Sequence, residues 1–180
     1  MTLAGKTALI TGSTSGIGLA YAKALAAEGA NIVINGFGDK DAIEQERLAL
    51  EQASGAKALY SGHDLTKVEE IEAMMREAAD LEDSVDKHPV TPGAVLPARE
   101  LLGDMLVMLE MPVAAIEAYE ASLQISPNRF NSLYGAGRAA ELAENSEKAK
   151  SYYSKLVQFA AKVDGDRPAI EQAQAFLSKD

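Results

Sequence analysis

The sequence predicts an α/β half followed by an all-α half. Runs of β-branched and apolar residues occur in the first eighty residues, where they alternate with segments of helical apolar spacing. Most of the 14 glycines also lie there, whereas all six prolines follow residue 88. Beyond residue 80 only the helical spacing remains. We therefore expect a parallel sheet with crossover helices in residues 1–80, a linker in residues 81–94, and helical hairpins in residues 95–180.

Three strands and three helices are expected in the first half. The runs Thr7–Thr11 and Asn31–Asn35 are typical of short buried strands, and Ala56–Ser61 is a weaker third strand. Helical spacing covers residues 17–28, 41–53 and 67–79. The order β-α-β-α-β-α requires right-handed crossovers and gives a parallel sheet of order 3-2-1. Strand one would keep an unpaired edge, so we expect a homodimer through it or docking of the C-terminal helices over it.

Five helices are expected in the second half. Their predicted ranges are residues 97–109, 112–125, 129–143, 146–161 and 167–178. Pro112 and Pro168 suit the first turn of a helix, and Asn145 is a start signal. Between the halves, Leu81–Gly93 is polar and contains two prolines, which predicts turns or extended polyproline structure.

Composition excludes several classes of function. The 27 acidic residues outnumber the 17 basic ones, and the net charge of −10 argues against binding to nucleic acid or to an anionic membrane. The chain has no cysteine, and its only histidines are His63 and His88, so we expect no disulfide and no metal site. No signal peptide and no run of about 20 apolar residues is present. A soluble cytoplasmic protein is expected.

A glycine-rich loop joins the first strand to the first helix. The segment Thr11–Gly18 places Gly12, Gly16 and Gly18 in the order G-x-x-x-G-x-G. Such glycines permit a tight turn, close approach of the backbone to a pyrophosphate, and close packing of helix on strand. The helix N-terminus then offers free N–H groups to phosphates. The alternative is a glycine-rich turn that only joins the strand to the helix.

This loop, TGSTSGIG, resembles the short-chain dehydrogenase/reductase family, as do NGFGD at Asn35–Asp39 and HDLT at His63–Thr66. The resemblance covers about residues 3–79 and is greatest to bacterial D-3-hydroxybutyrate dehydrogenases, which implies a partial Rossmann-type fold and an NAD cofactor. It implies pyrophosphate and nicotinamide contacts from Gly12, Thr14, Ser15, Gly16, Ile17 and Gly18. It also implies an adenosine ribose contact from Phe37 and adenine contacts from Asp64 and Leu65. The loop after strand two has no arginine for a 2′-phosphate, which favours NAD over NADP.

The catalytic part of that family's pattern is missing. The chain has no N-N-A-G segment and no Y-x-x-x-K pair, because none of the residues four positions after its six tyrosines is a lysine. Without a tyrosine activated by a neighbouring lysine, no proton donor for carbonyl reduction is evident. We therefore assign no catalytic residue. Only the first half of a doubly wound sheet is expected.

The second half carries an internal repeat of 34 residues. Gly103, Ala115 and Tyr119 each recur as the same residue type 34 positions later, and Leu102 and Pro127 complete the first unit. Residues 95–161 thus resemble tetratricopeptide-repeat proteins, with residues 167–177 as a capping helix. The alternative is a generic antiparallel helix bundle.

Such repeats generally bind peptides or proteins on the face formed by the first helix of each unit. The resemblance gives these candidate groove residues: Arg99, Asp104, Asn131, Tyr134 and Arg138. The sequence thus favours a non-catalytic interaction protein, with an unknown protein or peptide partner, fused to a vestigial and weak NAD-binding fragment. Three alternatives stay open: an NAD-dependent oxidoreductase completed by another chain, a chimeric product with no selected function, and a purely structural role for the helices.

Overall fold

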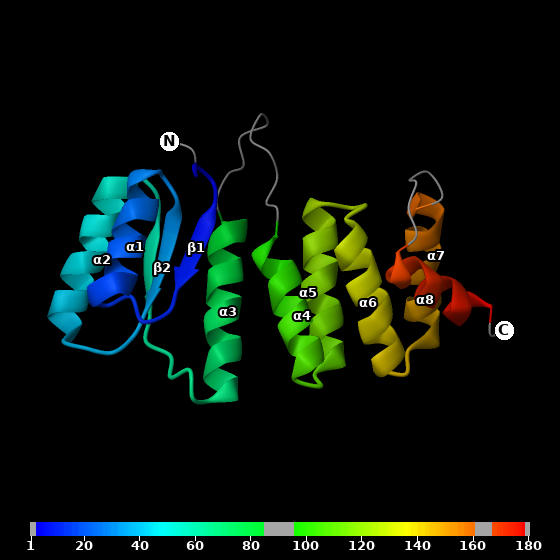
Figure 1. Ribbon diagram of the computed structural model, residues 1–180. Coiled ribbons are helices and arrows are strands. Elements are labelled where there is room, and N and C mark those ends of the chain that lie inside the picture. Colours follow the sequence, from blue (N-terminus) through cyan, green and yellow to red (C-terminus); the bar gives the residue numbers. More distant parts are fainter. Residues whose placement is uncertain (1–2, 85–95, 161–166, 179–180) are drawn as a thin grey trace. The chain divides into compact units, whose positions relative to one another are not determined.

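The computed structural model describes residues 3–84, 96–160 and 167–178 of the chain. The chain divides into two compact units, residues 1–98 and residues 99–180. The first, called the N-terminal unit below, contains a sheet and three helices, and the second, the helical unit, contains helices (Figure 1).

A three-stranded parallel sheet forms the centre of the N-terminal unit. Its strands are β1 (Thr7–Ile10), β2 (Asn31–Asn35) and β3 (Ala58–Ser61), in the spatial order β1-β2-β3. Leu9 lies beside Val33 in the register. The predicted parallel sheet and its order are confirmed. All five residues of β2 are buried, whereas the four residues of β1 are half-buried, because β2 has a neighbour on both sides.

Helices cover both faces of this sheet. Their bounds are Gly16–Ala27 for α1, Lys40–Ser54 for α2 and Val68–Asp83 for α3. Alternate β2 residues point to opposite faces, so Ile32 and Ile34 join the core under α1 and α2, while Val33 packs with residues of α3. Figure 1 shows α1 and α2 on one side of the sheet and α3 on the other.

Helix α3 is longer than the predicted helix 67–79. It continues to Asp83, and so occupies the first residues of the predicted linker 81–94. The cause is Leu81, which is buried with Ala78 against Val33 and Leu9 on the second face of the sheet. The sequence around Leu81 is polar and rich in turn signals, so it does not predict that the helix continues through this buried leucine. Residues 85–94 of the predicted linker lie outside the described residues.

Five helices lie in residues 96–160 and 167–178, and they follow the predicted ranges closely. They are α4 (Ala98–Met108), α5 (Pro112–Ile125), α6 (Phe130–Leu142), α7 (Ser146–Ala160) and α8 (Pro168–Leu177). Helix α6 packs against both α5 and α7, and α8 packs against α7. As expected, Pro112 and Pro168 lie in first turns, and Asn145 accepts the backbone N–H of Lys148 at the start of α7.

The two helical hairpins repeat the same backbone geometry 34 residues apart. Glu110 and Glu144, in the connections α4–α5 and α6–α7, have φ values of 57° and 55°. The residue after each of them donates its N–H to a carbonyl five residues back, Met111 to Leu106 and Asn145 to Ala140, both at 2.9 Å. This is the pattern of a helix that ends in a left-handed residue.

The same interval separates two buried tyrosines. Tyr119 and Tyr153 are 1% and 0% exposed. A Cβ at Gly103 would lie 2.7 Å from the Tyr119 ring, and one at Gly137 would lie 2.5 Å from the Tyr153 ring. Glycine at these positions therefore sets how closely the paired helices approach.

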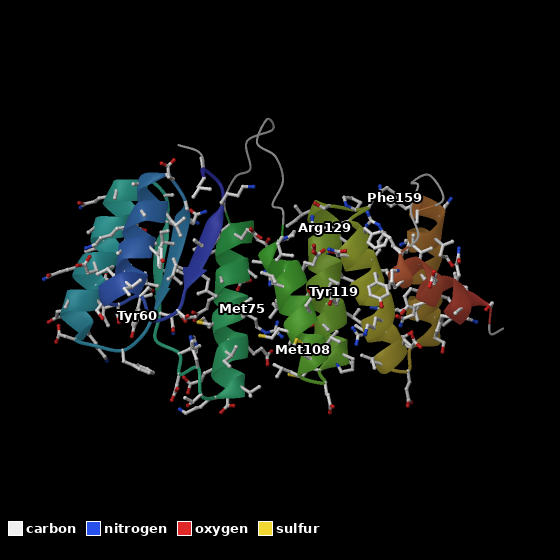
Figure 2. All side chains as sticks on the ribbon, viewed as in Figure 1. Tyr60, Met75, Met108, Tyr119, Arg129 and Phe159 are labelled. Carbon is white, nitrogen blue, oxygen red and sulfur yellow. The ribbon has the colours of Figure 1, made fainter. Side chains whose placement is uncertain are left out.

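A buried polar cluster joins α4 to α6. Glu100 is 1% exposed and accepts bonds from Arg129 Nε at 2.7 Å and Ser132 Oγ at 2.6 Å. Arg129, labelled in Figure 2, lies directly before α6. Because both partners of this carboxylate come from the start of α6, the cluster ties α4 to α6.

Candidate functional site

The loops that follow the three strands are joined by hydrogen bonds at the carboxyl-terminal end of the sheet. The Ser13 N–H donates to Asn35 O at 2.7 Å, which links the loop after β1 to the end of β2. The Asn35 side-chain amide donates to Ser61 O and His63 O, each at 2.9 Å, which links β2 to the loop after β3. In open parallel sheets the carboxyl ends of the strands are where ligands bind. All nine predicted cofactor residues lie in or beside these loops.

The glycine loop has the geometry that the sequence predicts. Gly12 and Gly16 have φ values of 62° and 58°, a region that favours glycine. A Cβ at Gly18 would overlap the backbone carbonyl of Gly12, so α1 can lie this close to the loop only with glycine there. Ser15 is the N-cap of α1 in an extended conformation. The first N–H groups of α1 therefore open onto the loop.

Two of the loop hydroxyls are used within the protein. Ser13 is fully buried, and its Oγ donates to Ile10 O at 2.6 Å and accepts from Asn35 N at 3.0 Å. Thr14 donates its hydroxyl to Phe37 O at 3.0 Å. Thr14, one of the predicted cofactor residues, thus fixes the loop after β2. The Ser15 side chain is exposed and makes no cap hydrogen bond to α1.

Large apolar side chains close to the loop in sequence are exposed. Ile17 and Phe37 are 77% and 68% exposed, and Tyr21 follows Ile17 by one turn of α1 at 62%. The Thr14 hydroxyl bonds the Phe37 carbonyl, so the Phe37 backbone lies beside the glycine loop. Exposed aromatic rings at this end of the sheet offer a stacking surface to a planar ligand.

The third loop holds Asp64 and Leu65. Asp64 accepts bonds from the N–H and the hydroxyl of Thr66, and these bonds hold the pKa of its carboxyl below the usual range. Its own N–H donates to Glu70 at 2.6 Å. The carboxylate therefore shapes the turn, and the exposed Leu65 follows it. His63 is satisfied by Ser61, whose Oγ lies 2.7 Å from its Nδ1.

Tyr152, in the helical unit, has a lysine close to its ring. Tyr152 donates its hydroxyl to Glu120, and Lys155 Nζ lies 5.7 Å from the centre of its ring. Burial, together with the Glu120 carboxylate, raises the pKa of Tyr152. These three residues line a hollow of about 370 Å³ between α5 and α7. Local sequence spacing does not predict this hollow, because Tyr152 and Glu120 are 32 residues apart in sequence.

The helical unit brings four of the five predicted groove residues to one hollow. It has a volume of about 340 Å³ and is lined by Asp104, Asn131, Tyr134 and Arg138, among others. Arg99 is not among its lining residues. The Tyr119 hydroxyl donates to Asp104 at 2.6 Å, so this carboxylate is fixed at the wall of the hollow.

Two kinds of site are not found in the part of the chain that the structure describes. Residues 3–84, 96–160 and 167–178 contain no group of three or more side chains suited to hold a metal ion. Within the same ranges no helix is both long and apolar enough to cross a membrane.

Comparison with known proteins finds a family match in the N-terminal unit. Residues 6–87 match the family described as short chain dehydrogenase. This segment contains all three strands, the glycine loop and α1 to α3, and it ends before the helical unit begins.

The relatives are oxidoreductases of greater length. D-beta-hydroxybutyrate dehydrogenase from Cupriavidus necator is 59% identical over 76 residues, which is 42% of this chain and 29% of the relative. The protein of that name from Rhizobium meliloti is 52% identical over 75 residues, again 42% and 29%. A solved metagenomic short-chain oxidoreductase in complex with NADP is 17% identical with a TM-score of 0.43, over 98% of this chain and 90% of that one. The chain thus matches under a third of the length of these curated relatives.

Proposed function

We propose that the N-terminal unit binds the adenosine diphosphate part of a nicotinamide dinucleotide, NAD rather than NADP, as part of an oxidoreductase-like domain. The observation that carries this proposal is the glycine loop, because Gly18 has no room for a side chain and Gly16 opens toward solvent. Beside it lie the first N–H groups of α1 and the backbone of Phe37, whose side chain is exposed. The family match over residues 6–87 supports the same ligand class.

The loop is suited to phosphate oxygens for a physical reason. At Gly16 a Cβ would meet no atom within 4 Å, so the backbone there is accessible to a ligand. The helix N-terminus carries a partial positive charge and unpaired N–H donors. No Lys or Arg follows β2 before Lys40, so a ribose 2′-phosphate would find no cation beside Phe37. This favours NAD.

Gly16 and Gly55 form a matched pair for testing the site. Gly55 ends α2 with a φ of 63°, close to the 58° of Gly16, and neither position has an atom within 4 Å of an added Cβ. Gly16→Val and Gly55→Val therefore impose similar backbone strain. Only Gly16→Val places a side chain in the glycine loop. By calorimetry we expect Gly16→Val to weaken NAD binding about tenfold or more, and Gly55→Val to leave it unchanged. Equal loss in both variants would contradict the proposal.

Binding in this unit is expected without turnover. Hydride transfer requires a positioned nicotinamide and a proton donor, and together these contribute many orders of magnitude to rate. The described residues offer no tyrosine and lysine arranged for this beside the loop. We expect no NADH absorbance to form from NAD and D-3-hydroxybutyrate. Turnover that Gly16→Val abolishes would show that a catalytic site exists.

For the helical unit we propose binding of a peptide or protein segment by tetratricopeptide-like repeats. The hollow lined by Asp104, Asn131, Tyr134 and Arg138 supports this, since it combines both charges, an amide and an aromatic ring. The 34-residue recurrence of the hairpin geometry supports the repeat assignment. The test is a peptide array read with the whole chain. Arg138→Ala should weaken the selected peptides about tenfold, while Arg99→Ala, outside the hollow, should not.

A further inference from the structure

The two edges of the sheet differ in how their backbone groups are used. On β3, Ile32 N donates to Lys57 O at 2.9 Å, so the groups of the next residue, Ala58, face away from β2. Charged side chains of α2 satisfy them: Arg47 Nη1 donates to Ala58 O at 2.8 Å, and Ala58 N donates to Glu51 Oε1 at 3.3 Å. At Ala58 the β3 edge is therefore closed by an ion pair.

The β1 edge has no such cover among the described residues. Asn31 N donates to Lys6 O at 2.8 Å, so the backbone groups of Ala8 and Ile10 face β2, and those of Thr7 and Leu9 face outward. Within residues 3–84 no hydrogen bond reaches the backbone N–H or C=O of Thr7 or Leu9. All four residues of β1 are half-buried, which makes unpaired groups costly.

We propose that β1 pairs with β1 of a second copy of the chain in antiparallel orientation, giving a continuous six-stranded sheet. Outward-facing residues must form the hydrogen-bonded pairs of an antiparallel ladder. Placing Thr7 opposite Leu9 of the second copy, and Leu9 opposite Thr7, meets this condition for both residues at once. The two copies of Ala8 meet on the twofold axis as a non-hydrogen-bonded pair, about 4.5 Å apart at Cα.

A second copy suits this edge because the pairing is self-complementary. One twofold axis lets the same four groups donate and accept on both chains. No charged residue lies between Thr7 and Ile10, and in this register Lys6 faces Ile10 of the second copy instead of another lysine. Within the strand Thr7–Ile10 the side chains are small or apolar, and it contains none of the long charged side chains that usually protect an edge.

Because the chain has no cysteine, single-cysteine variants test the register directly. Ala8→Cys should form a disulfide with its symmetry copy on mild oxidation, since Cβ atoms in such a pair lie close to disulfide distance. Tyr60→Cys is the control, because Tyr60 lies in the other edge strand and is 36% exposed. We expect about tenfold more covalent dimer from Ala8→Cys than from Tyr60→Cys.

Hydrogen exchange on the unmodified chain gives an independent test. Concentrating the protein should slow exchange at the Leu9 amide, which the second copy would bond. The Ala8 amide should be unaffected, because it bonds β2 in either state. A chain that sediments as a monomer at all concentrations would overturn the proposal. So would a dimer in which the Leu9 amide exchanges as fast as in the dilute monomer, or in which Ala8→Cys crosslinks no more than Tyr60→Cys.

Discussion

At the scale of single residues, Arg47 and Glu51 combine two tasks on α2. They form an ion pair at 2.9 Å one helical turn apart, and each also bonds the backbone of Ala58. The hydrogen bond from Arg47, followed by that from Ala58 N–H, holds the pKa of Glu51 below its ordinary value. The charged form of Glu51 is therefore the form that the fold stabilises.

This gives the stability of the N-terminal unit a pH dependence of known sign. A carboxyl whose pKa is lower in the folded state contributes stability above its unfolded pKa, near 4.5, and loses it as pH falls through the folded pKa. We expect the free energy of unfolding to fall on acidification below about pH 4.5. Glu51→Gln should reduce that fall, as measured by urea unfolding over a pH series. Glu46→Gln is the control, because Glu46 pairs with Lys23 and bonds no β3 backbone. An unchanged pH profile in Glu51→Gln would contradict the stabilising role of the Glu51 carboxylate.

The loop glycines could be predicted from the sequence, whereas the loop hydroxyls could not. The spacing of Gly12, Gly16 and Gly18 expresses local constraints: a turn, an opening and a close helix contact. The use of Ser13 and Thr14 depends on where the loop after β2 lies, and that is set by strand pairing 22 and 23 residues away in sequence. No local pattern reports such a contact.

At the scale of helices, the fit of Tyr119 against Gly103 predicts a stability effect. Gly103→Ala would normally favour a helix, but its Cβ would lie 2.7 Å from the Tyr119 ring. We expect a loss of about 1–3 kcal/mol from overpacking, measured by chemical unfolding. Gly137→Ala should cost a similar amount, because Tyr153 occupies the equivalent place.

The clash itself can be separated from other effects by a double-mutant cycle. In a Tyr119→Leu background the ring is gone, so Gly103→Ala should cost less than in the natural sequence. Gly137→Ala should keep its full cost in that background. If Gly103→Ala costs the same with and without the ring, the spacing does not depend on this contact.

Helix ends show where sequence patterns fail. The start of α7 can be predicted from the sequence because Asn145 caps it through its own side chain. The end of α3 cannot, because the helix continues to pack Leu81 against Val33 of β2, which is nearly fifty residues away in sequence. Helix boundaries set by capping are local, and those set by packing are not.

At the scale of the whole molecule, the helical unit should fold without the N-terminal unit. Its contacts join neighbouring helices, and its core residues Leu102, Tyr119 and Tyr153 come from residues 99–180. Local contacts of this kind do not require a distant partner. A fragment of residues 90–180 should be helical by circular dichroism and melt cooperatively. A disordered spectrum would contradict the independence of this unit.

The glycine loop is proposed to hold the adenosine diphosphate half of NAD, and binding of three ligands tests this. ADP-ribose contains the groups that the loops after β1, β2 and β3 are proposed to hold, whereas nicotinamide mononucleotide contains only the other half of NAD. By calorimetry on the whole chain, we predict that NAD and ADP-ribose bind with dissociation constants within about threefold of each other, and that the mononucleotide gives no heat. Binding of NAD without binding of ADP-ribose, or no binding of either, would contradict the proposed ligand.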